Sequence, residues 1–145
     1  MKIEQKAEIL KQLDTKNLIQ RLAEYEDKLD KALKEEASFK DLNYGYLSGA
    51  GDCAEVKRIN AELVAQVPDT DDKEKKLTAP QKEAWLLRQR TDDKELSGAI
   101  AQQKDVAFNL DNFRINIEMA KKRLEGTRAV IGLRTAQIRF LSDSE

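Results

Sequence analysis

The sequence predicts an all-α protein: an elongated antiparallel helical hairpin or coiled-coil-like bundle with one broken arm and one long C-terminal helix. Its composition supports this class, because 37% of the 145 residues are charged and 40% are hydrophobic, with only six glycines and two prolines. Apolar residues also recur at helical spacing along most of the chain. The longest such run keeps a seven-residue period from Leu96 to Leu141.

Apolar residues at helical spacing predict a first helix over residues 2–42. The step from Leu13 to Leu18 is five residues, so the apolar stripe changes phase there. Two alternatives stay open at this point: Thr15 caps a new helix, or one helix continues through a stutter. Three glycines between residues 43 and 51 then predict a loop, because glycine disfavours a helix interior.

A second, short helix is predicted over residues 52–67. Asp52 followed by Glu55 resembles a capping box at its start. The next segment, residues 68–78, is polar and predicts a mobile loop at the tip of a hairpin.

A third helix is predicted over residues 79–141. Thr78 is suited to cap it and Pro80 to occupy its first turn, where the missing amide is harmless. Weak helix formers lie between residues 91 and 98. Because Trp85 occupies the same heptad position as Ala99, we nevertheless predict one continuous helix. The alternative is a break, with Asp92 and Glu95 as a second cap.

Helix lengths favour a hairpin as the topology. A third helix of about 63 residues would span about 95 Å, which the two shorter helices together nearly match. We therefore predict a single domain over residues 1–145, with its tip near residues 68–78. In the alternative path the second helix folds back on the first, and a three-helix bundle results.

The seven-residue period defines what we call the inner seam of the third helix, which consists of two heptad positions. Its members are Leu96, Ala99, Gln103, Val106, Leu110, Phe113, Ile117, Ala120, Leu124, Thr127, Ile131, Arg134, Ile138 and Leu141. The polar members Gln103, Thr127 and Arg134 are predicted to fix register or helix number, as polar residues in helical seams commonly do.

The same helix carries a second apolar stripe, about 160–180° from the inner seam at 100° per residue. This outer face consists of Phe108, Ile115, Met119, Ala129, Leu133, Ala136 and Phe140. Three alternatives stay open for what packs against this face: a third helix of the same chain, a second copy of the protein, or a different partner protein. We predict a homodimer, with Phe108, Ile115, Met119, Leu133 and Phe140 at its interface, because twofold self-association is the commonest assembly.

Charge gives only a local argument for nucleic acid, since the net charge of the chain is −1. Arg114, Lys121 and Arg128 repeat every seven residues beside the inner seam. We predict that they pair with acids of the first helix, which are Glu24, Glu26, Asp27, Asp30, Glu35 and Glu36. The alternative is a nucleic-acid-associated accessory protein that binds phosphates through these three basic residues.

The residue types do not predict an enzyme. Histidine is absent, which removes the usual general base and the commonest metal ligand. Cys53, the single cysteine, is predicted to be a packed thiol at a helix start rather than a nucleophile. The glycines match no phosphate-binding motif, so we expect no cofactor, no metal and no catalytic residue.

The remaining expectations concern compartment and role. The first residues lack the apolar run of a signal peptide and no segment is apolar enough to cross a membrane, so we expect a cytoplasmic protein with no membrane partner. Tyr44 and Tyr46 lie in the glycine-containing break and are candidates for contact with a ligand or partner. Together these features predict a non-enzymatic scaffold or regulatory adaptor that acts by binding proteins.

Overall fold

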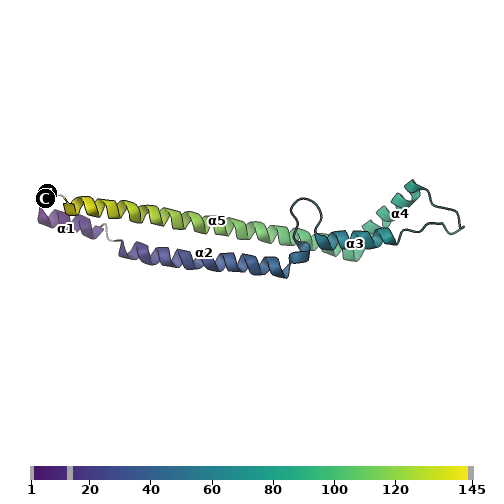
Figure 1. The fold of residues 1–145 in the computed structure, drawn as a ribbon, viewed down its shortest axis with the longest axis horizontal. Coiled ribbons are helices and arrows are strands. Elements are labelled where there is room, and N and C mark those ends of the chain that lie inside the picture. Colours follow the sequence, from purple (N-terminus) through teal and green to yellow (C-terminus); the bar gives the residue numbers. More distant parts are fainter. Residues whose placement is uncertain (1, 13–14, 144–145) are drawn as a thin grey trace. The chain divides into compact units, whose positions relative to one another are not determined.

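The computed structural model describes residues 2–12 and 15–143 and confirms the all-α class (Figure 1). Within these ranges the only strand-like pairing is an isolated bridge between Thr70 and Lys76. The elements are α1 (Ile3–Gln12), α2 (Lys16–Leu42), the 3₁₀ helix η1 (Tyr44–Tyr46), α3 (Ala54–Ala65), α4 (Ala79–Asp92) and α5 (Lys94–Asp143). None of the described helices is long and apolar enough to cross a membrane.

The chain divides into two compact units, and α5 contributes to both. Unit 1 comprises residues 1–37 and 112–145, and unit 2 comprises residues 38–111. That the whole chain forms a single domain stays a prediction.

In unit 1, α1 and α2 run antiparallel to α5. Glu26 of α2 pairs with Arg128 of α5, whereas Ile9 of α1 lines a pocket together with Phe140 and Leu141. Residue numbers therefore rise along α1 and α2 as they fall along α5, which is the antiparallel path that the sequence predicts.

The structure has two helices where one was predicted over residues 2–42. The carbonyl of Thr15 accepts a hydrogen bond from the backbone N–H of Ile19 at 2.8 Å, as a residue at a helix start does. Leu13, where the predicted phase change begins, lies outside the described residues. Of the two alternatives left open, the structure therefore has the new helix.

Unit 2 is built around α3. A core of buried residues joins α3 to the first turns of α5, with Tyr46 and Leu86 packed against it. The fully or almost fully buried members of this core are Cys53, Val56, Ile59, Leu63, Leu96 and Ala99. Since Arg58 pairs with Glu95, and Cys53 is bonded to Gln103, α3 is antiparallel to α5.

The predicted helix over residues 79–141 is wrong in one respect, because α4 ends at Asp92 and α5 begins at Lys94. Asp93 separates them with an extended backbone, at φ −74° and ψ 116°. Its carboxylate accepts a hydrogen bond from the backbone N–H of Leu96 at 2.7 Å, which caps α5. Helix continuity is lost because this side chain satisfies an amide that a continuous helix would pair with the residue four earlier.

The other predicted helix starts have different outcomes. Thr78 forms a complete capping box with Gln81, and a proline lies in the first turn of α4, as expected. The predicted box of Asp52 and Glu55 does not form: Cys53 is the N-cap of α3 and makes no side-chain cap bond. Glu55 instead binds Arg58, one turn further along the helix.

The segment over residues 68–78, predicted as a mobile loop, contains a hydrogen-bonded turn. The carboxylate of Asp71 accepts bonds from the backbone N–H groups of Lys73 and Lys75, both at 2.9 Å. Glu74 adopts a left-handed conformation at φ 61°, which allows the chain to reverse. An aspartate that bonds to its own following backbone explains how a polar segment forms a turn here.

The inner seam has the burial that its period predicts. All fourteen of its positions are buried or half-buried, whereas every other residue of α5 from Lys94 to Asp143 is exposed. The helix therefore presents one continuous stripe to the rest of the protein.

Candidate functional site: the outer face of α5

The outer face of α5 is exposed along its whole length. The exposed fractions of its large side chains run from 48% for Met119 to 74% for Phe140, with Ile115, Leu133 and Phe108 between these values. Ile115, Met119, Leu133 and Phe140 belong to unit 1, and Phe108 belongs to the part of α5 in unit 2. Exposed apolar side chains that line up on one face are typical of a protein-binding surface.

Helix geometry explains why this face stays uncovered. Residues of the inner seam lie on one side of α5 and are buried, so the outer face, nearly half a turn away, points away from that contact. No described residue of α5 outside the inner seam is buried or half-buried. Of the three predicted covers, a third helix of the same chain is therefore not found over the described part of this face.

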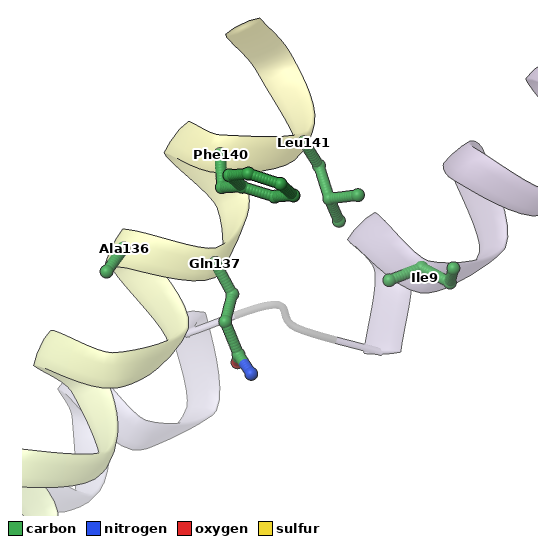
Figure 2. Close-up of a pocket in the computed structure, with 5 residues that line it drawn as sticks. All are labelled: Ile9, Ala136, Gln137, Phe140 and Leu141. Carbon is green, nitrogen blue, oxygen red and sulfur yellow. The ribbon is translucent and has the colours of Figure 1, made fainter. Parts of the chain in front are cut away.

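An apolar pocket adjoins the outer face at the C-terminal end of α5 (Figure 2). It has a volume of about 420 Å³ and lies between α1 and α5 within unit 1. Its lining is Ile9, Ala136, Gln137, Phe140 and Leu141. Ala136 and Phe140 belong to both the pocket and the outer face, so the apolar surface continues into this hollow.

At least two of the three basic residues proposed for nucleic acid have acidic partners within the protein. Arg128 pairs with Glu26 of α2 at 3.2 Å, as the sequence predicts for this residue. Lys121 lies 3.9 Å from Glu118 on its own helix. Arg114 is exposed. Part of the positive charge is therefore neutralised locally, which reduces its attraction for phosphates.

The two tyrosines of the break have different environments. Tyr44 is 78% exposed, whereas Tyr46 packs against the core of unit 2. Tyr44 is therefore the more accessible of the two candidates, and a contact of either tyrosine with a ligand or partner stays a prediction.

The polar members of the inner seam are satisfied in different ways. Gln103 accepts a hydrogen bond from the backbone N–H of Cys53 and donates to Ser48 and Gly51. Thr127 donates to the carbonyl of Arg123 in its own helix. Gln103 therefore holds the break against α5, in agreement with the role in register that we expected of it.

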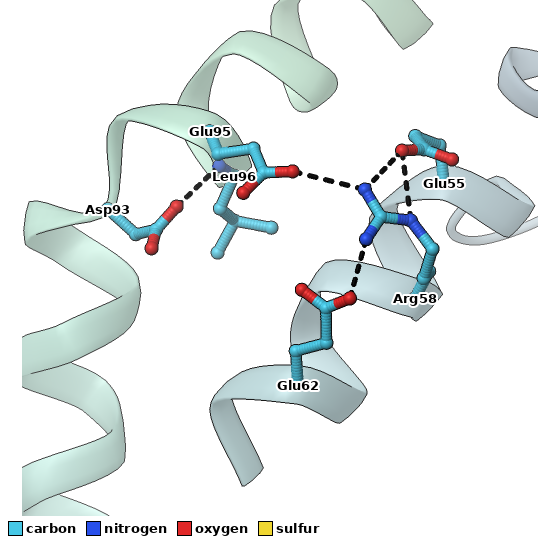
Figure 3. A network of polar contacts seen from close by, with 6 residues as sticks. All are labelled: Glu55, Arg58, Glu62, Asp93, Glu95 and Leu96. Carbon is cyan, nitrogen blue, oxygen red and sulfur yellow. Dashed lines mark hydrogen bonds and ion pairs between the residues drawn. The ribbon is translucent and has the colours of Figure 1, made fainter. Parts of the chain in front are cut away.

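Sequence reasoning missed a polar network that joins α3 to α5 (Figure 3). The guanidinium group of Arg58 donates to Glu55, to Glu62 at 2.6 Å and to Glu95 at 3.0 Å. The hydrogen bond from Arg58 lowers the pKa of Glu55, and the bonds to Glu55 and Glu95 raise the pKa of Arg58. The spacing of Glu55, Arg58 and Glu62 was the available signal, since residues three and four apart are neighbours on a helix.

A second cavity, in unit 2, was also missed. It has a volume of about 360 Å³ and mixed polar and apolar walls. Its lining is Asp52, Val56, Asn60, Arg90, Thr91, Leu96 and Ile100. The side-chain oxygen of Asn60 is buried without a hydrogen-bond partner, so an ordered water molecule with a free donor would satisfy it.

Cys53 is a packed thiol rather than an accessible one. Its side chain is 0% exposed and lies in the core of unit 2. Its backbone amide, not its sulfur, makes the contact with Gln103. This agrees with the expectation of a structural cysteine at a helix start.

No known protein family, curated protein or solved structure matches this chain, so the outer face of α5 has to be interpreted from its own geometry.

Proposed function

We propose that the protein is a non-enzymatic protein-interaction module, a scaffold or regulatory adaptor, that self-associates through the outer face of α5. The observation that supports this proposal is that one helix, α5, carries both a buried inner seam and an exposed apolar face on its opposite side. A helix that only had to pack within its own chain would need one apolar stripe. The second stripe is best explained by a surface outside the chain.

Burial of the outer face between two copies can offset the cost of association. Full burial of a large apolar side chain contributes about 1.5–3 kcal/mol. Four large side chains of the outer face are already partly covered in the single chain: Ile115, Met119, Leu133 and Phe140. On association each can therefore contribute only roughly half of the free energy of full burial. Two copies of the four side chains together supply a free energy of the same order as the roughly 4–15 kcal/mol that association costs.

Light scattering over a range of concentrations tests this proposal. The chain has a mass of 16.5 kDa, and we expect twice this mass at high concentration. Ile115→Glu should restore the single-chain mass, because it places a charge in the interface at a position that is 57% exposed in one chain. Leu87→Glu, at a 66% exposed position of α4, is the matched control and should leave the dimer intact. A single-chain mass at every concentration would contradict the proposal.

The nucleic-acid alternative has a separate test. A gel-shift titration at low and moderate salt compares the protein with a variant in which Arg114, Lys121 and Arg128 are replaced by Glu. Binding at low salt that is lost in the variant would favour the alternative, since phosphate contacts weaken steeply with salt. The pairing of Arg128 with Glu26 leads us to expect no shift.

The proposed compartment is the cytoplasm. The single cysteine, Cys53, is fully buried as a free thiol, which is compatible with a reducing environment.

A further inference from the structure

We infer that the occupant of the outer face is the α5 helix of a second copy, packed antiparallel in one defined register. In this register Phe140 lies opposite the partner's Ile115, and Ala136 lies opposite the partner's Met119. Gly126 lies opposite the partner's Ala129, which puts the twofold axis between these residues. The inference rests on the proposed function and adds the orientation and the pairing of residues.

The outer face has the spacing of a second helical seam. Within unit 1 the residues of the outer face, together with Lys122 and Gly126 between them, follow one another in alternating steps of four and three residues, as the two core positions of a heptad do. The complete line consists of Ile115, Met119, Lys122, Gly126, Ala129, Leu133, Ala136 and Phe140. All of these residues are exposed, so the whole line is available to another helix.

A parallel pairing is disfavoured by Lys122. In a parallel twofold pair each core residue lies opposite its own copy, so the two Lys122 ammonium groups would face each other in an apolar seam. In the antiparallel register Lys122 lies opposite the partner's Leu133. The aliphatic part of a lysine can cover a leucine while its charge reaches water.

Charge complementarity selects the register. The positions that flank the outer face place Arg139 beside the partner's Glu118, and symmetry repeats this pair at the other end. A shift of one heptad in one direction places Glu125 beside the partner's Glu125 and Arg123 beside the partner's Arg123. A shift in the other direction places Phe140 opposite the partner's Lys122 and Met119 opposite the partner's Asp143. The register with Arg139 and Glu118 therefore avoids like charges and keeps the large apolar side chains together.

Gly126 supplies an independent observation. A methyl group added at this position would meet nothing within 4 Å, so packing inside the chain does not require a glycine here. Glycine is unfavourable in a helix interior. Its presence at the centre of the proposed interface, opposite the partner's Ala129, is explained if two helix backbones approach closely at the axis.

The apolar pocket beside Phe140 fits the same arrangement. Ala136, which lies opposite the partner's Met119, lines this pocket together with Ile9 and Phe140 (Figure 2). A methionine side chain is flexible and fills irregular apolar spaces. The partner's Met119 therefore has a pocket of about 420 Å³ next to the residue that it faces.

Thiol cross-linking between two singly substituted proteins tests the register. We expect a short bismaleimide to link Arg139→Cys to Glu118→Cys when the two variants are mixed. Neither variant alone should give a linked dimer, because these positions lie about 32 Å apart along one helix. Wild-type protein is the control for Cys53, whose side chain is fully buried.

Two matched variants distinguish the other registers. Arg139→Cys is mixed with Asp111→Cys or with Glu125→Cys. Compared with Glu118→Cys, the second thiol then lies one heptad, about 10 Å, away along the helix in one direction or the other. A stronger product with either of them than with Glu118→Cys would overturn the register, and a product from Arg139→Cys alone would indicate a parallel pair. If light scattering shows a dimer and no mixture cross-links, this arrangement is wrong while the proposed function stands. If the protein is a monomer, both fail.

Gly126→Leu tests the close approach at the axis. We expect at least tenfold weaker dimerisation, with the fold of the single chain retained because the added side chain enters open space. Gly98→Leu is the matched control, since Gly98 is also a glycine of α5 with nothing within 4 Å of an added methyl group. Equal dimerisation of Gly126→Leu and wild type would overturn the proposed axis.

Discussion

Gln103 of α5 accepts a hydrogen bond at 3.0 Å from the backbone N–H of Cys53, a residue 50 positions earlier in the chain. The amide nitrogen of the same side chain donates to the hydroxyl group of Ser48 and to the carbonyl of Gly51, both at 3.2 Å. One side chain in the inner seam therefore satisfies two groups of the glycine-containing break and the backbone amide of the N-cap residue of α3. This contact sets where α3 begins relative to α5.

Replacing Gln103 should destabilise unit 2. We expect Gln103→Leu to lower the free energy of unfolding by about 1–3 kcal/mol, because the amide of Cys53 loses its partner. Chemical denaturation measures this loss, and hydrogen exchange should show faster exchange at Cys53. Gln102→Leu, at an exposed neighbouring position, is the control. Unchanged exchange at Cys53 would show that the contact contributes nothing.

The break between α4 and α5 depends on Asp93. Asp93→Ala removes the acceptor for the N–H of Leu96 and should cost about 1 kcal/mol of stability, the usual effect of losing a helix cap. Thermal unfolding followed by circular dichroism measures the loss. Asp92→Ala removes the same charge one residue earlier and should have a smaller effect. If the two variants are equally stable, the cap is not responsible for the helix start.

The core of unit 2 should be sensitive to cavities. Ile59 is 2% exposed, and we expect Ile59→Ala to lower the free energy of unfolding by about 2–5 kcal/mol. Val64→Ala, on the same helix at a position that is 51% exposed, should change it little. Denaturant titrations of both variants check this difference. Similar losses for both would mean that α3 is not packed through the face that contains Ile59.

The Arg58 network should make the free energy of unfolding of unit 2 decrease in acid. Its hydrogen bond lowers the pKa of Glu55 from the ordinary value of 4.5, so the unfolded chain binds the proton more readily. The stabilisation is complete above about pH 4.5 and is lost as the pH falls through the lowered pKa of the folded state.

Glu55→Gln isolates this effect. We expect the variant to be less stable than wild type at neutral pH and to lose less stability between pH 6 and pH 3, as measured by hydrogen exchange in α3. Glu83→Gln removes a carboxyl group from an exposed position of α4 and controls for the loss of charge. An acid loss in Glu55→Gln equal to that of wild type would contradict the role of the network.

The features that could be predicted from the sequence are those that depend on residues close together in the chain. The burial of the inner seam follows from a period of seven residues, and the cap of α4 involves only Thr78 and Gln81. The position of the outer face could be predicted for the same reason, since it lies opposite a seam on the same helix, whereas its exposure in the single chain could not.

Other features depend on contacts between distant residues and were missed. The bond between Arg58 and Glu95 joins residues 37 positions apart, and the burial of Tyr46 depends on α3. The break at Asp93 was only the alternative for a different reason: the residues around it are weak helix formers that a helix can still include, and one hydrogen bond from the N–H of Leu96 to Asp93 decides the outcome. Local propensity does not settle such a choice.

The dependence of the melting temperature on protein concentration tests the role of the outer face most directly. If two copies associate through this face, the melting temperature of wild type should rise over a hundredfold increase in concentration, because mass action stabilises the folded dimer. The melting temperature of Ile115→Glu should stay constant over the same range. A melting temperature of wild type that does not change with concentration, or one that rises equally in Ile115→Glu, would contradict the account.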